Sequence, residues 1–358
     1  MHAVFFSDQH LASLGGAQVS MRLQRRFLEK AGHTVTVVAP AMHGPRARAS
    51  AGDPAFVDLP SIPITADREY SFTWPGRRTD RFVDAALAAR PAVDVVHVQA
   101  DFWGAFVGHR FARRHGLPVV HTMHNRVDVG IEAVSPFPGL TLRALNAWER
   151  RMLGGLPERR RNGRMSEHSA QMLRRSRDAP TSGGPSGGTD GWAYLRGLAA
   201  GARAVTAPSG HFARRLERHG VFGHVDVVWN GIDDDVLDAL LAEAEPADAG
   251  APRRAGRPRF IWLGRMSPEK RLLPFLEAVA ESGIDADVEV LGGGAQLRAA
   301  RRFVQRRGLT ASVVFGGRMP YPDTLRRIAA ADALVQTSIG FETQGMTPFE
   351  AAALGTPS

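Results

Sequence analysis

Two cationic side chains stand five positions apart in the segment from Gly264 to Lys270. An apolar run at 260–263 precedes it and a helical pattern follows. Arg265 and Lys270 are therefore expected at the carboxyl end of a strand, where open α/β sheets bind ligands. Arginine holds a diphosphate through a planar fork of donors, and lysine holds it as a point charge. The only other lysine in this arginine-rich chain is Lys30. A lysine at position 270 is therefore informative, and the segment indicates a diphosphate site. A surface salt bridge between Lys270 and Glu269 is the alternative.

Glu342 and Glu350 lie eight residues apart near the end of the sequence. With Glu342 in a loop and Glu350 two turns into a following helix, they would be roughly 10–12 Å apart along the axis. A retaining glycosidase needs its paired carboxylates at about 5 Å, so that chemistry is excluded. The spacing would let the two carboxylates bind opposite ends of one extended ligand. The alternatives are a Glu342 carboxylate that interacts with a helix dipole and a Glu350 on a solvated helix face.

Glycines occur at two predicted strand ends, as Gly15-Gly16 and as Gly292-Gly293-Gly294. Glycine lets the backbone approach an anion, and a helix that follows directs free N–H groups toward it. A tight turn without a ligand is the alternative. Neither segment has the Gly-x-Gly-x-x-Gly spacing of a dinucleotide site, which disfavours a Rossmann oxidoreductase.

His121 and His124 follow a further predicted strand. A histidine with a near-neutral pKa can hydrogen-bond a sugar hydroxyl or stabilise developing charge. A packed histidine satisfied by backbone groups is the alternative. A zinc pair lacks an evident third ligand, so no metal site is predicted.

Short apolar runs typical of strands buried on both faces alternate with helical stretches and must position these residues. This alternation predicts an α/β fold with parallel, doubly wound sheets. Strands are expected at 3–7, 34–39, 94–98, 118–122, 203–207, 225–228, 260–263, 288–291, 313–315 and 333–337. Helices are expected at 17–31, 270–282, 295–307 and 322–331, and from about Gln344 onward.

Composition divides the chain into residues 1–228, a linker at 229–257 rich in Ala, Pro, Gly and charge, and residues 258–358. Residues 156–190 are Arg-rich and then Ser/Gly/Pro-rich, which is typical of a flexible insert. A basic contact of this insert with anionic lipid is the alternative to a disordered loop.

The 358 residues carry a formal charge of +9 and no cysteine. Disulfides and thiolate metal sites are therefore excluded, and a reducing cytoplasm fits. The sequence has no apolar run long enough to cross a membrane, no signal peptide at its N-terminus and no recognised nucleic-acid module. We expect a cytoplasmic protein without a nucleic-acid partner, at the inner face of the membrane if its acceptor is a lipid.

Together these motifs resemble family 4 of the glycosyltransferases, a retaining family with the GT-B fold. The resemblance implies two Rossmann-like parallel-sheet domains facing a cleft, with acceptor binding in the first domain and nucleotide-sugar binding in the second. The motifs that carry it are Ser7-Asp8 with Gly15–Gln18, Gly32–Val35, Ala207–Ser209, Asn230–Asp233, Gly264–Lys270, Gly292–Gly294, and Glu342–Glu350 followed by Gly355-Thr356-Pro357.

The resemblance also implies roles for single residues. Arg265 and Lys270 would bind the donor diphosphate and stabilise the leaving group, Glu350 would hold the ribose, and Glu342 would contact the donor sugar. His124, and with it His121, would face the reacting sugar, and Arg318-Met319 would meet the base. The implied catalytic residues are His124, His121, Glu342, Arg265 and Lys270. The implied donor-binding residues are Gly15, Gly16, Arg265, Lys270, Gly293, Arg318, Met319, Glu342, Thr343, Gln344, Gly345 and Glu350.

The family mechanism implies transfer with retention, in which the departing phosphate takes the acceptor proton. The two cations make a metal cofactor unnecessary; Mg²⁺ is compatible with the site but is not implied. The donor would be a UDP- or GDP-sugar. The acceptor would be a lipid or a carbohydrate, in cell-envelope glycan or glycolipid synthesis, and aromatic and basic residues around Phe102, Trp103, Arg126 and Phe137 favour a lipid or membrane-surface acceptor.

The sequence stops in the turn Gly355-Thr356-Pro357-Ser358, where the family continues with a further strand and helices. The resemblance therefore implies an incomplete second domain, for which we expect an exposed apolar sheet edge and reduced stability and activity. A truncated, non-catalytic nucleotide-sugar-binding remnant is the main alternative function. A sugar phosphorylase and a nucleotide-sugar epimerase are less favoured.

Overall fold

The computed structural model describes residues 1–13, 15–43, 52–65, 68, 70–154, 190–242, 256–339 and 342–358. The chain forms two compact units, Met1–Asn230 and Gly231–Ser358. Phe341, most of the insert expected at 156–190 and the central part of the expected linker lie outside the described residues.

A seven-stranded parallel sheet forms the centre of the first unit, in the order β3-β2-β1-β6-β7-β8-β9. Its strands are β1 (His2–Ser7), β2 (Thr34–Pro40), β3 (Phe56–Leu59), β6 (Val95–Gln99), β7 (Val119–Thr122), β8 (Ala204–Ala207) and β9 (Val225–Val227). All six strands predicted for this half are present. The edge strand β3 was missed, because four residues with one charged member carry little periodicity. A short antiparallel hairpin joins β4 (Ile62–Pro63) to β5 (Ser71–Phe72).

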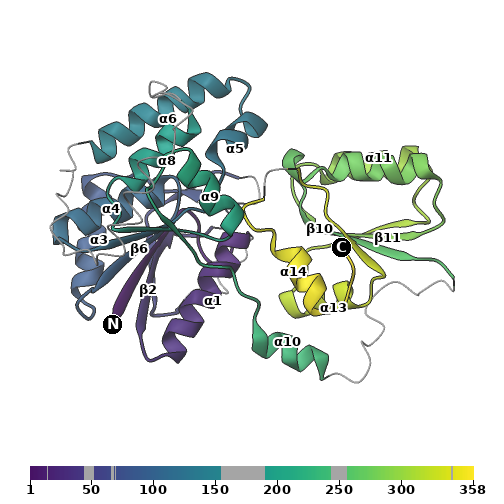
Figure 1. Cartoon of the computed structure of the whole chain (residues 1–358), viewed down its shortest axis with the longest axis horizontal. Coiled ribbons are helices and arrows are strands. Elements are labelled where there is room, and N and C mark those ends of the chain that lie inside the picture. The colour runs from purple at the N-terminus through teal and green to yellow at the C-terminus, as the bar shows by residue number, and fades with distance from the viewer. Residues whose placement is uncertain are drawn as a thin grey trace. The chain divides into compact units, whose positions relative to one another are not determined.

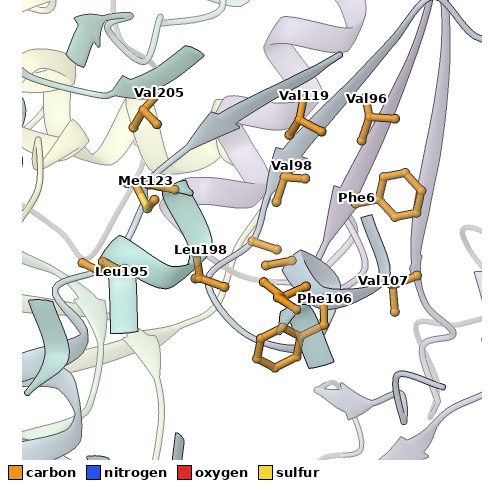
Figure 2. Close-up of a cluster of buried hydrophobic side chains, with 14 of the residues drawn as sticks. Phe6, Val96, Val98, Phe106, Val107, Val119, Met123, Leu195, Leu198 and Val205 are labelled. Carbon is orange, nitrogen blue, oxygen red and sulfur yellow. The ribbon is translucent and has the colours of Figure 1, made fainter. Parts of the chain in front are cut away.

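Side chains of the central strands alternate between two cores, as the period of two in a strand requires. Val4 and Phe6 face the larger core, whereas Ala3 and Phe5 pack with Met21 of helix α1 (Gly16–Lys30) on the other face. Figure 2 shows Phe6, Val98 and Val205 of the sheet in the larger core with Phe106, Leu195 and Leu198 of the covering helices. Both faces of the sheet are thus buried, as the apolar runs predicted.

Helices cover both faces of the first sheet (Figure 1). Helix α1 lies on one face, and the larger core lies under the others. Helix α6 packs on α8 and on α4, and α4 in turn packs on β1 and β6. The helices of the larger-core face are α3 (Arg77–Ala88), α4 (Trp103–His115), α5 (Val127–Val134), α6 (Pro138–Leu153), α8 (Gly191–Ala199) and α9 (Gly210–Arg218).

A four-stranded parallel sheet forms the second unit, in the order β12-β11-β10-β13. Its strands are β10 (Arg259–Arg265), β11 (Asp287–Gly293), β12 (Val313–Gly317) and β13 (Ala333–Val335), all four as predicted. Trp262 and Val290 face one core, and Ile261 and Leu291 face the other. Helices α11 and α12 pack against each other on the face that carries Trp262 and Val290. The helices of the unit are α10 (Asp234–Leu241), α11 (Leu272–Ser282), α12 (Leu297–Arg306), α13 (Tyr321–Ala329), α14 (Met346–Ala353) and the 3-10 turn η1 (Pro268–Lys270).

Two details of the second unit differ from expectation. Helix α10 falls within the range expected as a linker, yet Leu240 is buried in the core that α13 and α14 share. At the edge strand β13, where an exposed apolar edge was expected, Leu334 is only 3% exposed and its N–H donates to the Pro357 carbonyl at 2.7 Å. The C-terminal residues of the chain therefore lie against this edge.

Each sheet has one point where the strand order reverses direction. In the first unit β1 lies between β2 and β6, and in the second β10 lies between β11 and β13. Ligands of open α/β sheets bind outside the carboxyl ends of the strands at such points. The residues that follow β1, β6, β10 and β13 are therefore the ones to inspect.

Candidate functional site

Lys270 and Glu342 meet at the switch point of the second sheet, although 72 residues separate them in the sequence. Lys270 ends the turn η1 after β10, and its Nζ donates to Glu342 Oε1 in the loop before α14. Thr337, just beyond β13, donates through Oγ1 to the Lys270 carbonyl at 2.7 Å. The alternative to a diphosphate site was a salt bridge of Lys270 with Glu269, whereas the carboxylate paired with Lys270 here is that of Glu342.

Arg265 is also held by a carboxylate. Its Nη2 lies 3.3 Å from Glu269 Oε1, while the guanidinium side chain is 53% exposed and the Glu269 side chain only 7%. Both predicted cations are thus paired with acidic side chains at a solvent-accessible edge. Because charge-assisted bonds to phosphate oxygens are of comparable strength, a diphosphate can replace the partly exposed Glu342 carboxylate on Lys270. The Glu269 carboxylate is nearly buried and keeps the Ser267 hydroxyl as a donor if Arg265 turns to a ligand.

The glycines after β11 are explained by close backbone contact. A Cβ on Gly292, whose φ is 114°, would lie 2.0 Å from the Gly264 carbonyl oxygen, and one on Gly294 would lie 2.7 Å from that of Met266. Met266 N–H donates to the Gly293 carbonyl at 2.8 Å. These glycines let the loops after β10 and β11 lie against each other, which fixes the backbone that carries Arg265.

Arg318 and Met319 follow β12 at the same edge of the sheet. The Arg318 side chain passes over Gly293, where a Cβ would meet its Nε at 2.9 Å. Met319 packs instead against the core beneath α13. The structure therefore brings Arg318 to the edge and uses the Met319 side chain for packing.

Glu350 is buried in α14, with 6% of its surface exposed. This position excludes the solvated helix face that the sequence left open. Burial raises the pKa of the Glu350 carboxyl, and the neighbouring Tyr321 hydroxyl partly opposes the rise. Gly345, with φ 73°, turns the chain into α14, and a Cβ there would lie 3.7 Å from Glu342 Cβ. Thr343 and Gln344 are half-buried in this turn.

Gly15 and Gly16 start helix α1 after β1, at the corresponding edge of the first sheet. A Cβ on Gly15 would lie 2.1 Å from Gln18 Oε1, whereas one on Gly16 would meet nothing within 4 Å. The space beside Gly16 is compatible with close approach of a ligand, and the Gly15 position is occupied by the Gln18 carboxamide.

The two predicted histidines differ in their surroundings. His121 is fully buried; its Nε2–H donates to the Ala100 carbonyl at 2.9 Å, and its Nδ1 accepts from His109 Nε2 at 3.1 Å. This is the packed, backbone-satisfied arrangement. His124 lies at the edge, 8% exposed, and its Nε2 is 3.1 Å from Gln99 Oε1. Burial and the nearby His121 lower the pKa of His124 to about 4, so this ring is neutral near pH 7.

Two carboxylates, to which the sequence assigned no role, organise the edge around His124: Asp101 is fully buried and Asp8 is half-buried. Asp8 accepts from the backbone N–H groups of Asp101 at 2.8 Å, Phe102 at 3.0 Å and Gly104 at 2.8 Å. It thereby occupies the N-terminal donors of α4. Asp101 Oδ2 accepts from His124 N–H at 3.2 Å, Asn125 N–H at 2.9 Å and Asn125 Nδ2 at 2.7 Å.

Burial raises the pKa of Asp101 to about 7, and the charge of Asp8 adds to the rise. Burial also raises the pKa of Asp8 to about 6, against the effect of its backbone donors. Asp101 Oδ1 has no hydrogen-bond partner. A signal for both residues was present in the sequence. Asp8 directly follows the strand predicted at 3–7, and Asp101 lies three positions beyond the strand predicted at 94–98, at the edge where polar side chains of neighbouring parallel strands gather.

Within the described ranges, no group of three or more histidine, aspartate or glutamate side chains is arranged to hold a metal ion. No helix in the described part of the chain is both long enough and apolar enough to cross a bilayer.

Two family models match the chain. The one described as Glycosyltransferase Family 4 matches residues 14–181, and the one described as Glycosyl transferases group 1 matches residues 245–358. An alpha-monoglucosyldiacylglycerol synthase of Streptococcus pneumoniae is 23% identical over 365 residues, which cover 100% of this chain and 70% of that relative. A 2-deoxystreptamine glucosyltransferase of Streptomyces kanamyceticus is 33% identical over 138 residues, 37% of this chain and 35% of the relative.

Solved structures agree in fold. HepE of Anabaena, in complex with UDP and glucose, matches with a TM-score of 0.62 at 15% identity and covers 100% of this chain and 79% of its own. Sucrose-phosphate synthase of Thermosynechococcus elongatus matches with a TM-score of 0.63 at 17% identity, with 99% and 79% coverage. At these identities the likeness concerns the fold alone.

Proposed function

Since the chain belongs to the family 4 glycosyltransferases, which have the GT-B fold, we propose that it moves a sugar with retention from a UDP- or GDP-sugar to a lipid or carbohydrate acceptor in cell-envelope glycan or glycolipid synthesis. The observation that carries the proposal is the pairing of Lys270 with Glu342 beside Arg265, at the switch point of the second sheet. Cations held by carboxylates at an accessible edge are suited to exchange partners with a diphosphate.

On the donor side, Lys270 and Arg265 bind the diphosphate and stabilise the charge that develops on it as the sugar departs. Electrostatic stabilisation of this kind is usually the largest catalytic contribution. Release of Glu342 from Lys270 frees its carboxylate to accept hydrogen bonds from the sugar hydroxyls. Glu350, fixed within α14, accepts hydrogen bonds from the ribose hydroxyls, and Arg318 lies on the side of the base.

On the acceptor side, His124 contacts the reacting sugar from the first unit. Its Nε2–H donates to Gln99 Oε1, and a neutral imidazole then carries its lone pair on Nδ1. His124 is therefore a neutral ring near pH 7, and the departing phosphate takes the acceptor proton. Asp101 is a positioning residue that holds the backbone of His124.

The names of similar proteins favour one choice among the open ones. The Streptococcus pneumoniae relative is named for a glucosyldiacylglycerol product, and HepE structures are described with UDP and with UDP-glucose. We therefore rank UDP-glucose first among donors and a membrane lipid first among acceptors.

The test is calorimetric titration of the protein with UDP, GDP, UDP-glucose, GDP-mannose and NAD⁺, beside Glu350→Ala and Lys270→Ala. We expect one nucleotide series to bind and both substitutions to weaken it at least tenfold, about 1.4 kcal/mol. Transfer to diacylglycerol in mixed micelles is then assayed with the series that binds. Binding of NAD⁺ alone would contradict the proposal. Nucleotide binding without sugar transfer would support the alternative of a non-catalytic nucleotide-sugar-binding protein.

A further inference from the structure

The outward side of helix α6 exposes an unusual set of side chains. Positions 137, 140, 143, 144, 147, 150 and 151 all face solvent, and we name them the α6 face: Phe137, Leu140, Arg143, Ala144, Ala147, Arg150 and Arg151. Phe137 is 69% exposed and Leu140 is 67% exposed. The opposite side packs inward through Leu142 and Leu153. At 1.5 Å per residue the face is roughly 21 Å long, which is ample for contact with a large surface.

Charge on the α6 face has a single sign. Its three arginines form no ion pair within 4.0 Å of a described carboxylate. The one acidic residue of the helix, Glu149, is buried on the other side and interacts with Arg150 only through its longer-range charge. At 100° per residue, Arg143 and Arg150 lie along one border of the face. The strip beside them holds Leu140, Ala144 and Ala147 and also Arg151, which lies between Leu140 and Ala144. A helix face that combines exposed arginines with exposed phenylalanine and leucine is typical of contact with a membrane interface.

A row of aromatic rings runs from helix α6 toward the reaction edge. Trp148 of α6 packs against Trp74, with ring centroids 6.0 Å apart, and Trp74 is 63% exposed. Phe72 follows at 6.0 Å from Trp74, and Trp103 at 5.2 Å from Phe72. Trp103 Nε1 donates to the Asp8 carbonyl at 2.7 Å. Exposed tryptophan is favoured at the headgroup level of a bilayer, and this row joins the α6 face to Asp8.

The hairpin beside this row adds exposed apolar surface. Ile62 and Ile64 are 62% and 53% exposed. Helix α3 follows Trp74 directly, and its first turn exposes Arg77, Arg78 and then Arg81. The combination of exposed isoleucine, tryptophan and arginine on adjacent elements repeats the chemistry of the α6 face.

We propose that the α6 face, with Trp74 and the β4-β5 hairpin, docks the protein on an anionic lipid bilayer. The exposed arginines of the face attract anionic headgroups, and Phe137, Leu140 and Trp74 enter the headgroup boundary. A nucleic acid would use the arginines but would leave the apolar strip in water. The inference deepens the proposed function, because the aromatic row places the docked bilayer beside the edge that carries Asp8 and His124.

The experiment measures co-sedimentation of the protein with vesicles, which needs no turnover. Vesicles of phosphatidylcholine mixed with phosphatidylglycerol are compared with phosphatidylcholine alone, at low and high salt. Two variants remove the two parts of the face: Arg143→Glu with Arg150→Glu, and Phe137→Ser with Leu140→Ser. Matched controls make the same changes in the second unit: Arg302→Glu with Arg306→Glu on α12, and Ile284→Ser with Val314→Ser.

We expect salt-sensitive binding to the anionic vesicles, at least a tenfold loss in both α6 variants and less than a threefold change in the controls. No binding to anionic vesicles at low salt would overturn the proposal, as would an equal loss in the α12 control. Binding to duplex DNA that is as tight as vesicle binding, and unaffected by Phe137→Ser with Leu140→Ser, would also overturn it. UDP titration of the same variants separates the two ideas: lost vesicle binding with intact UDP binding supports the docking face, and absent UDP binding in the parent counts only against the proposed function.

Discussion

The two sheet edges stabilise their carboxylates in different ways. At the edge of the first unit, Asp101 is buried and Asp8 is half-buried. Both accept hydrogen bonds chiefly from backbone N–H groups, and desolvation raises the pKa of each. At the edge of the second unit, the carboxylates of Glu269 and Glu342 are paired with cations, and Arg265 remains half exposed. The first edge is fixed from within by hydrogen bonds, and the second is held by ion pairs that a charged ligand can exchange.

This difference indicates that the first edge is preorganised, whereas the second edge binds its ligand by exchanging ion-pair partners. Buried hydrogen-bonded groups are costly to disturb, so the backbone around His124 keeps its geometry whether or not a substrate is present. A partly exposed ion pair such as Lys270–Glu342 contributes little to stability, so replacing it with a diphosphate loses little. Substitutions and pH should therefore affect the two edges unequally.

The largest expected effect comes from Gly292→Ala in the second unit. The new Cβ would lie 2.0 Å from the Gly264 carbonyl oxygen, in a backbone with φ 114°, so β10 and β11 must separate at their ends. We expect a loss of at least about 3 kcal/mol in the unfolding free energy of this unit, measured by hydrogen exchange of β10 and β11.

Gly308→Ala is the matched control, because Gly308 also has positive φ, 67°, but meets nothing within 4 Å. Its expected cost is about 1 kcal/mol. Equal losses in the two variants would mean that backbone strain alone, and no close approach of the loops, explains the glycines after β11.

Acid should destabilise the first unit. Burial lowers the pKa of its core histidines below the ordinary value of 6.5. As the pH falls through 6.5, these histidines therefore become protonated in the unfolded chain but stay neutral in the folded unit. The raised pKa values of Asp8 and Asp101 act in the opposite direction, because the folded carboxyls gain protons first. The histidine pKa values are about 3 for His97, about 4 for His121 and His124, and well below 6.5 for His109.

On unfolding near pH 5, the four histidines take up about four protons and the two carboxyls release about two, so the net uptake is about two protons. The unfolding free energy of the first unit should therefore fall by about 2–3 kcal/mol per pH unit as the pH is lowered. Urea unfolding followed by tryptophan fluorescence at pH 7 and pH 5 measures this, since five of the six tryptophans lie in the first unit. The second unit should respond oppositely, because burial raises the pKa values of Glu289 and Glu350. A first unit as stable at pH 5 as at pH 7 would refute the contrast.

Sequence reasoning reached the fold and most of one edge, and the reason is physical. Strands buried on both faces leave apolar runs, so all ten predicted strands are present. Short segments such as β3 and the β4-β5 hairpin lack that signal. Helix α10 was taken for linker because its surroundings are rich in Ala, Pro and charge, although its single buried Leu240 anchors it.

At the two edges, spacing along the chain predicted which residues belong together but not how they pair. The partner of Lys270 is set by the position of β13 beside β10, which no local pattern encodes. The fully buried state of His121 follows from His109 on α4, a helix that was not predicted. The role of Asp101 depends on the adjacency of β6 and β7, which places its carboxylate under the His124 backbone.

Asp101→Ala should cost less than the acid effect yet alter catalysis. It leaves the three N–H groups that Asp101 Oδ2 now accepts without an acceptor, which we expect to lower the unfolding free energy by about 2 kcal/mol. The His124 loop then loses its position, so kcat should fall more than UDP affinity, while Asp101→Asn should recover part of both. Asp84→Ala, which removes only surface pairs with Arg114 and His115, should change kcat less than twofold.

The smallest expected effect is a gain. Glu342→Gln removes the carboxylate that holds Lys270, at a site where the two side chains are 26% and 19% exposed. Pairs of this kind contribute about 0.2–1 kcal/mol, so we expect UDP to bind about two- to fivefold more tightly to the variant, because the diphosphate no longer competes with Glu342. Sugar transfer should fall at the same time, since the proposed contact of Glu342 with the donor sugar is lost. Calorimetry with UDP measures the first effect, and Glu269→Gln tests whether the Arg265 pair behaves alike. Weaker UDP binding by Glu342→Gln would mean that Glu342 holds Lys270 in its binding position, and that the second edge is preorganised like the first.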